Sequence, residues 1–214
     1  MTRSLVLGAS GGIGAALAAR LGREGDVVGL SRSGDGLDVT DAEAVDRVLG
    51  ALDPAFDVVM VATGILAPEG HAPEKALDAI DANAMARTFA VNAIGPALVL
   101  RHMPRLLAPG GRVGVLTARV GSIGDNRMGG WYSYRAAKAA ANQVVRTASV
   151  ELARRVKGSV VAALHPGTVE TPFTEGYKAK KLSPEESADR LIGVLLGLEE
   201  TGVFRDWKGE AVEW

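Results

Sequence analysis

A tyrosine and a lysine stand four residues apart in an alanine-rich part of the sequence, as Tyr134 and Lys138. In a helix this spacing is about one turn, so both side chains lie on one face and can reach the same ligand. A phenol is a poor acid or base at neutral pH because its pKa is about 10, but the charge of a nearby lysine favours the phenolate. The pair therefore predicts proton transfer by Tyr134, although a solvated lysine beside a half-buried tyrosine would show the same spacing.

A glycine-rich segment near the N-terminus could hold the phosphates of a nucleotide. The apolar run 5–7 before it is typical of a buried strand, and Ile13, Leu17 and Leu21 after it share one helical face. Glycine lets the backbone between strand and helix approach a pyrophosphate, and the helix N-terminus favours the anion. Close packing of helix on strand is the alternative, but this setting favours nucleotide binding. The residues expected to hold the phosphates are Gly8, Ser10, Gly11, Gly12, Ile13 and Gly14.

Glycines at 8, 12 and 14, followed by Tyr-x-x-x-Lys, resemble the two signatures of the short-chain dehydrogenase/reductase family. This spacing is wider than the G-x-G-x-x-G of most dinucleotide folds. The resemblance covers nearly the whole chain and implies hydride transfer between a nicotinamide and a carbonyl or alcohol carbon of a small substrate. Within the family, the segments 118–126, 129–135 and 206–209 are most similar to the C-factor and sniffer-type carbonyl reductase branch.

The resemblance also implies roles for residues elsewhere in the chain. Asn92 resembles the family's helix asparagine, whose kinked backbone holds a water that links the lysine to solvent. Lys138 would bind the nicotinamide ribose, and Asp38 and Val39 resemble the pair beside adenine. Two further segments, after the fourth and sixth strands, are expected to contact the cofactor through Ala62, Thr63, Gly64, Pro166, Gly167, Val169 and Thr171.

The group that would hold the substrate oxygen departs from the family pattern. Members often end the fifth strand with Ser-Ser, whereas this chain has Thr117 and Ala118 there. Ser122 stands twelve residues before Tyr134, close to the family's usual separation. We therefore assign the substrate carbonyl to Ser122 in preference to Thr117. The pocket is expected to include Trp131, the loop 124–130 and the segment 173–182.

The turn after the second strand bears on the choice of cofactor. A carboxylate there binds the ribose hydroxyls of NAD, whereas an arginine accommodates the phosphate of NADP. This turn contains Ser31 and Arg32, and no acid precedes Asp35. A surface arginine without a ligand is the alternative. We expect NADP (NADPH) in preference to NAD, with Ser31 and Arg32 as contacts.

Composition limits the other classes of function. The 214 residues are 47% hydrophobic and carry a net charge of −1, which suits one domain over residues 1–214 and predicts no nucleic-acid or membrane partner. The chain has no cysteine, which excludes disulfides and thiolate chemistry. His71, His102 and His165 are scattered without a carboxylate cluster, so no metal is expected. No signal peptide or long apolar run is visible, and we expect a cytoplasmic protein.

Strands alternate with helices, which predicts an α/β fold with a doubly wound parallel sheet of the Rossmann type, three layers (α/β/α) and a single domain. Thr40 is the expected N-cap of the second long helix, and Pro96 or Pro104 should kink or end the helical run 73–107. Further helices are expected over 131–157 and from Ser183 to about 198. The expected strands are 5–7, 27–30, a short one at 37–39, 57–62, 112–117, 160–164 and 203–204.

Two other functions compete with this one. A dinucleotide-binding signalling or regulatory protein of the C-factor type would fit the branch, although such a protein needs no tuned phenol. A sugar-nucleotide epimerase or dehydratase is disfavoured because little chain remains after Thr174 for a substrate domain. Small residues in 83–107 and 131–157, with the family resemblance, predict a homodimer or homotetramer through paired helices.

Overall fold

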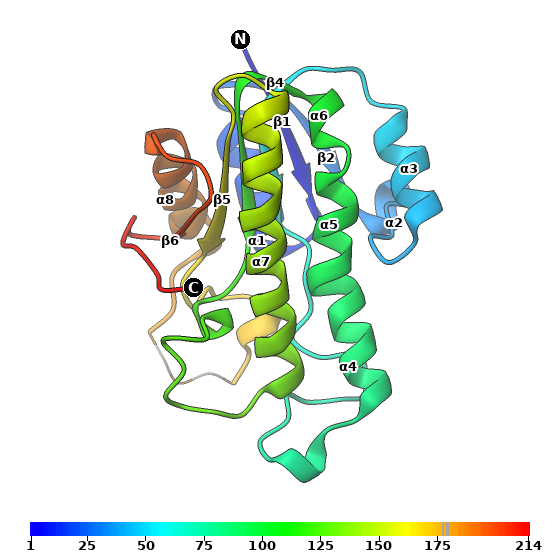
Figure 1. Cartoon of the computed structure of the whole chain (residues 1–214), viewed down its shortest axis with the longest axis vertical. Coiled ribbons are helices and arrows are strands. Elements are labelled where there is room, and N and C mark those ends of the chain that lie inside the picture. The colour runs from blue at the N-terminus through cyan, green and yellow to red at the C-terminus, as the bar shows by residue number, and fades with distance from the viewer. Residues whose placement is uncertain (177, 179) are drawn as a thin grey trace.

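In the described part of the chain, six parallel strands form the central sheet, in the order β2-β1-β3-β4-β5-β6 (Figure 1). The computed structural model describes residues 1–176, 178 and 180–214. The inner strands are almost wholly buried because helices cover both faces, as their unbroken apolar runs predict. The strands are β1 (Thr2–Leu7), β2 (Gly25–Leu30), β3 (Phe56–Val61), β4 (Leu107–Leu116), β5 (Val160–His165) and β6 (Val203–Asp206).

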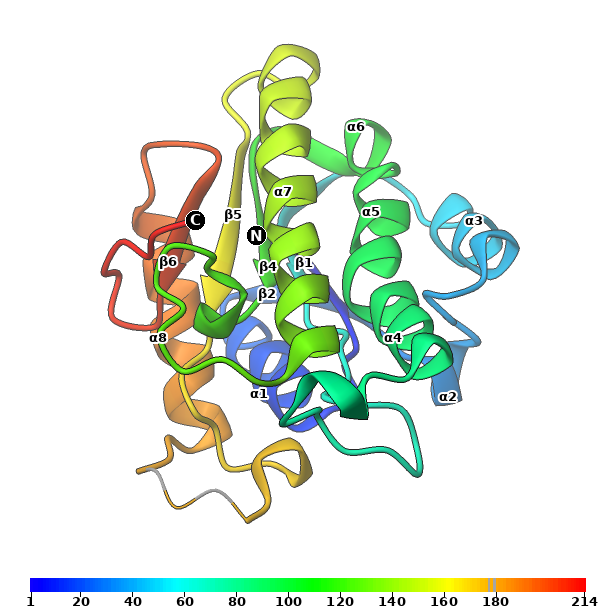
Figure 2. The same cartoon turned by 60° about the horizontal axis from the view of Figure 1, so that its bottom comes forward.

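Helices lie on both faces of the sheet and give the expected three layers (Figures 1 and 2). Side chains alternate along β4, so Val113 and Val115 pack with residues of α3, α5 and α7, whereas Gly114 faces Leu195 of α8. The helices are α1 (Gly12–Leu21), α2 (Arg32–Asp35), α3 (Ala42–Gly50), α4 (Ala82–Phe89), α5 (Gly95–Leu100), α6 (Met103–Leu106), α7 (Tyr132–Arg155) and α8 (Pro184–Gly197). Shorter turns are η1 (Leu77–Ala79), η2 (Ala90–Ile94), η3 (Arg119–Gly121) and η4 (Pro172–Thr174).

The order of the strands reverses at β1, which pairs with β2 on one side and β3 on the other. Leu7 at the end of β1 lies beside both Leu30 and Val61, the last residues of those two strands. In an open parallel sheet a ligand crevice forms beyond the carboxyl ends of the strands at such a reversal. The fold therefore places the expected site next to the glycine-rich segment 8–14.

The expected short strand at 37–39 is wrong, because this segment folds back on the preceding turn. The N–H of Leu37 donates to the carbonyl of Ser31, and the Thr40 hydroxyl donates to the Asp38 carboxylate at 2.6 Å. The backbone N–H of Asp38 donates to the carbonyl of Gly36, so the N–H groups of Leu37 and Asp38 are both used within the turn and are not available to a neighbouring strand. Val39 is nevertheless buried, with 6% of its surface exposed.

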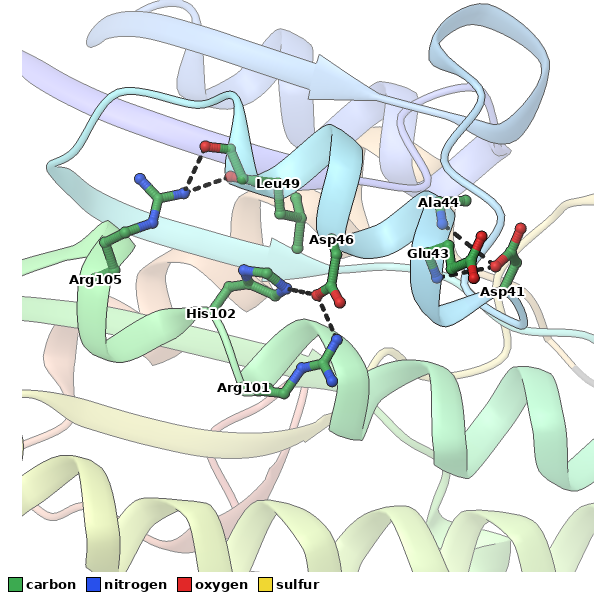
Figure 3. Close-up of polar contacts among 9 residues, drawn as sticks. Asp41, Glu43, Ala44, Asp46, Leu49, Arg101, His102 and Arg105 are labelled. Carbon is green, nitrogen blue, oxygen red and sulfur yellow. Dashed lines mark hydrogen bonds and ion pairs between the residues drawn. The ribbon is translucent and has the colours of Figure 1, made fainter.

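Thr40 is also not the N-cap of α3, because Asp41 accepts two N–H groups of the first turn instead (Figure 3). In the middle of α3, the Asp46 carboxylate contacts Arg101 and Nε2 of His102, which lie between α5 and α6 (Figure 3). In the expected helical run 73–107, α-helix begins only with α4, and Arg101 and His102 interrupt the run before Pro104, as predicted for a proline. No helix in the described part of the chain is long and apolar enough to cross a bilayer.

Candidate active site

A cavity of about 540 Å³ opens beyond the carboxyl ends of β1, β3, β4 and β5. It gathers residues from segments that are far apart in the sequence, among them most of those expected to bind the cofactor. The predicted residues that line it are Ser10, Gly11, Gly12, Ile13, Gly14, Ala62, Thr63, Gly64, Tyr134, Lys138, Pro166, Gly167, Val169 and Thr171.

The glycine turn supports the floor of this cavity through close backbone contacts. Gly8 has a φ of +86°, and a Cβ there would lie 3.0 Å from the carbonyl carbon of Ala62. A Cβ on Gly14 would lie only 2.0 Å from the carbonyl oxygen of Gly8, and one on Gly12 would lie 2.8 Å from Thr171. The turn therefore requires glycine for packing at 8 and 14, and a side chain at 12 would meet the methyl group of Thr171. Gly11 stands at the N-cap position of α1, and both Gly11 and Gly12 line the cavity. The N-terminus of α1 therefore lies beside the cavity.

Tyr134 and Lys138 lie on the first two turns of α7, buried together as their spacing predicts. Only 6% of Tyr134 and 4% of Lys138 are exposed. The lysine Nζ donates to the carbonyl oxygen of Leu116 at 3.2 Å and lies 5.8 Å from the centre of the tyrosine ring. Burial lowers the pKa of Lys138 to about 8. The ammonium is therefore still mostly protonated at neutral pH, close to the phenol.

Asn92 lies behind the cavity, in the π-helical turn η2 between α4 and α5. Proline at position 96 cannot donate to the Asn92 carbonyl four residues earlier, which accounts for the irregular turn. The Asn92 amide is fully buried and bonds both backbone groups of Ile65, at 3.0 Å and 2.8 Å. A Cβ on Gly64 would lie 3.0 Å from the Asn92 Oδ1 and 3.4 Å from the Lys138 Nζ. The two side chains thus meet around Gly64, in a kinked segment as the family resemblance implied.

Ser122 does not line the cavity, contrary to the position that we expected for it. The turn η3 follows Ala118 and carries the chain past the cavity, so the Ser122 hydroxyl accepts the N–H of Asp125 at 3.1 Å. Thr117, the alternative, lines the cavity at the end of β4. Its hydroxyl is buried and has no hydrogen-bond partner in the described part of the chain. The structure therefore brings Thr117, and not Ser122, to the site of Tyr134.

The residues expected at the adenosine end lie at the end of β2, outside the cavity. Arg32 is exposed on α2, whose N-cap is Ser31. The Asp35 carboxylate accepts the N–H of Ser31 at 2.8 Å. Hydrogen bonds from Thr40, aided by the charge of Arg32, hold the pKa of Asp38 below its ordinary value.

Sequence reasoning missed several lining residues, among them Arg119 and Val120 after β4 and His165 at the end of β5. Their places directly after strands were the signal that could have found them. Burial lowers the pKa of His165 to about 4, although the charge of Asp206 opposes this, so the imidazole is neutral. Its Nδ1 has no partner among the described residues, and the same holds for the hydroxyl of Thr63. The cavity therefore offers buried polar atoms to a ligand that carries donors and acceptors, as a nicotinamide dinucleotide does.

Aromatic rings form the wall next to Tyr134. Its ring meets Trp131 edge-on, with centroids 6.1 Å apart, and Phe173 at 5.8 Å. Trp131 and Phe173 were expected to line the pocket and do so, whereas the loop 124–130 does not. Residues 177 and 179 of the expected segment 173–182 lie outside the described residues. The wall is apolar and suits the carbon skeleton of a small substrate.

The chain is similar to a family model, to characterised relatives and to a solved structure with a bound cofactor. The family model described as enoyl-(acyl carrier protein) reductase matches residues 31–202. The 1-hydroxy-2-glutathionyl-2-methyl-3-butene dehydrogenase of Rhodococcus sp. (strain AD45) is 32% identical over 100% of both chains. C-signal of Myxococcus xanthus is 41% identical over 143 residues, which cover 65% of this chain and 84% of that protein. A short-chain dehydrogenase/reductase structure from Burkholderia multivorans with bound NADP is 28% identical, with a TM-score of 0.87 over 100% of this chain and 99% of that one.

Proposed function

The chain belongs to the short-chain dehydrogenase/reductase family, and we propose that it is an NADP-dependent oxidoreductase acting on a carbonyl or alcohol carbon of a small substrate. The similarity to C-signal agrees with the C-factor branch expected from the sequence. One observation carries the proposal: Tyr134 and Lys138 are buried together on a cavity that the glycine turn also lines. A phenol next to an ammonium in such a cavity is suited to proton transfer.

The residues of the chain divide the work of this reaction. When bound, the nicotinamide supplies or accepts the hydride. In the reductive direction Tyr134 gives its hydroxyl proton to the substrate oxygen, and the charge of Lys138 stabilises the phenolate that remains. Lys138 would also bind the nicotinamide ribose. Asn92 supports the proton relay to solvent from its turn behind Gly64.

The substrate oxygen needs a second donor beside the phenol. Thr117 supports this role because its buried hydroxyl lines the cavity without another partner among the described residues. Ala118, which takes the place of a family serine, can supply no hydroxyl. We assign the role to Thr117, and Ser122 is the alternative that must be tested against it.

NADP is the proposed cofactor because the turn after β2 presents an arginine. Arg32 is exposed there, whereas the nearest acid of the turn, Asp35, accepts the N–H of Ser31. The similar structure from Burkholderia multivorans contains NADP. Asp38 and Val39 would lie beside the adenine, and the phosphates would lie on the glycine turn.

A screen of carbonyl compounds against the purified protein, following NADPH absorbance, tests the proposal. We expect reduction of at least one small ketone or aldehyde, with no reduction by the Tyr134→Phe variant. The apolar wall formed by Trp131 and Phe173 favours compounds with hydrophobic substituents. Equal rates for the parent and the variant would contradict the assignment of the general acid.

A second candidate is a dinucleotide-binding signalling protein with little or no turnover. The similarity to C-signal favours it, and so does the missing hydroxyl at Ala118. This function requires cofactor binding but no proton donor. A protein that binds NADPH tightly and reduces no compound in the screen would favour this second candidate.

A further inference from the structure

Glu74 is 59 residues away from Ser133 in sequence, yet it contacts the start of the helix that carries Tyr134. It belongs to the segment between β3 and α4, which passes the first turn of α7 (Figure 2). Its side chain is buried, with 8% exposed, and both carboxylate oxygens accept hydrogen bonds from Ser133. Oε2 accepts the backbone N–H of Ser133 at 3.1 Å, and Oε1 accepts its hydroxyl.

The first turn of α7 has no cap of its own. Trp131 stands at the N-cap position, where an indole has no oxygen that could accept a backbone N–H, and the first turn contains no acidic residue. A helix start leaves backbone N–H groups without intrahelical partners and attracts negative charge. Glu74 supplies both the acceptor and the charge from 59 residues away.

Glu74 also holds the backbone immediately before the helix. Its carbonyl oxygen accepts the N–H of Trp131 at 2.5 Å. Trp131 has a φ of +56°, a left-handed conformation that bulky side chains rarely adopt, and Gly129 and Gly130 before it also have positive φ. Such a conformation persists only where surrounding contacts enforce it, and it is frequent at functional sites. Glu74 therefore contacts the chain on both sides of Tyr132, directly before Tyr134.

We propose that Glu74 is a positioning residue for catalysis: it caps α7 and thereby fixes the Tyr134 hydroxyl and the Trp131 ring at the cavity. This inference rests on the proposed oxidoreductase function. Burial would raise the pKa of Glu74, but the hydrogen bonds from Ser133 outweigh it and hold the pKa below its ordinary value, so an ionised carboxylate makes these bonds. Glu74 does not line the cavity, so its effect on the reaction passes through the geometry of the helix.

Three variants separate this role from a general loss of stability. Glu74→Ala removes both bonds to Ser133. Glu74→Gln keeps an oxygen that can accept the N–H and an amide that can donate to the serine hydroxyl. Asp41→Ala is the matched control, because it removes a carboxylate cap from α3, away from the cavity. Hydrogen exchange of residues 132–135 and kcat at saturating NADPH and substrate are measured for each.

For Glu74→Ala we expect exchange of residues 132–135 at least tenfold faster, kcat at least tenfold lower and an NADPH Kd within threefold of the parent. Glu74→Gln should recover kcat to within threefold, and Asp41→Ala should leave both quantities at the parent value. Unchanged exchange or unchanged kcat in Glu74→Ala would overturn the proposal, as would equal damage in Glu74→Gln. If the parent itself shows no turnover, the proposed function fails, and the exchange rates alone decide whether Glu74 holds α7.

Discussion

The Nζ atom of Lys138 lies 5.8 Å from the centre of the Tyr134 ring, and both side chains are almost completely buried. In this arrangement the ammonium favours an ionised phenol more strongly than it would in water, because buried charges are screened less. The lysine itself is disfavoured by the same burial, which lowers its pKa to about 8. The buried charge of Lys138 therefore favours proton transfer by Tyr134 but lowers the free energy of unfolding of the protein.

Replacing Tyr134 by phenylalanine should abolish turnover and leave the affinity for NADPH nearly unchanged, because only the proton donor is lost. Steady-state kinetics and fluorescence titration with NADPH measure the two effects. Tyr132→Phe is the matched control, since it removes a phenol from the same turn of α7, at a position with alanine four residues on. Loss of turnover in the control as well would assign the effect to the helix and not to the phenol.

Replacing Lys138 by methionine should stabilise the protein without cofactor while reducing its activity. A pKa of about 8 against 10.5 for a free lysine corresponds to a cost of about 3 kcal/mol at neutral pH. Urea unfolding at pH 7 should therefore give a higher free energy of unfolding for the variant, reduced by the lost bond to the Leu116 carbonyl.

The difference in free energy of unfolding between Lys138→Met and the parent should also depend on pH. Between pH 8 and 10.5 the unfolded parent binds more protons at Lys138 than the folded parent, so the parent gains stability as pH rises through this window. The free energy of unfolding of Lys138→Met should therefore exceed that of the parent by less as the pH rises. Lys157→Met, at an exposed position, should show no such change. A constant difference from pH 7 to 10.5 would show that Lys138 is not destabilised by burial.

Arg32→Ala should weaken NADPH more than NADH, because only NADPH loses a charge-assisted bond to its additional phosphate, worth about 1.5–3 kcal/mol. The ratio of the Kd for NADH to the Kd for NADPH should fall about tenfold or more. Isothermal titration with both cofactors measures it, and Arg154→Ala, at an exposed position on α7, is the control. Equal losses of affinity for both cofactors would show that Arg32 does not bind the additional phosphate of NADPH.

Thr117→Ala and Ser122→Ala distinguish the two hydroxyls. Loss of a donor to the substrate oxygen should lower kcat roughly tenfold to a hundredfold in Thr117→Ala. Ser122→Ala loses the bond to the Asp125 N–H, so thermal stability should fall slightly and kcat should stay within about twofold. The reverse pattern would restore Ser122 to the role that its spacing suggested.

The parts of the site that depend on local sequence were predictable. Strand, glycine turn and helix follow one another within 1–21, and Tyr134 and Lys138 need only one helix to bring them together. The parallel sheet with helices on both faces followed from the alternation of elements, since short connections and right-handed crossovers leave few topologies.

The parts that depend on contacts between distant segments were not predictable. Spacing in sequence favoured Ser122, but the turn η3 redirects the chain and leaves Thr117 at the cavity. Nothing near Ser133 indicates that its partner is Glu74, because the two residues meet only after the segment before α4 has packed against α7. The segment 37–39 looked like a strand, yet bonds to residues on either side of it formed a turn.

The small residues of α7 differ in burial, so some pack within the domain and others are accessible to a second copy of the chain. Ala137 and Ala141 are fully buried, which supports the alternative that some alanines pack within the domain, whereas Ala136 is exposed. Farther along, Ala148 lies in a groove of about 420 Å³ between α5, α6 and α7. A second copy of the chain could place its own helices there about a two-fold axis.

We therefore expect a homodimer or homotetramer, and sedimentation at micromolar concentration tests it. Ala148→Arg places a large charged side chain in the groove and should shift the protein toward the mass of one chain. Glu185→Arg, at an exposed position on α8 on the opposite face of the sheet, should leave the association intact. A single parent species near 22.2 kDa would rule out the paired helices and would leave the small residues of α7 explained by packing within the domain.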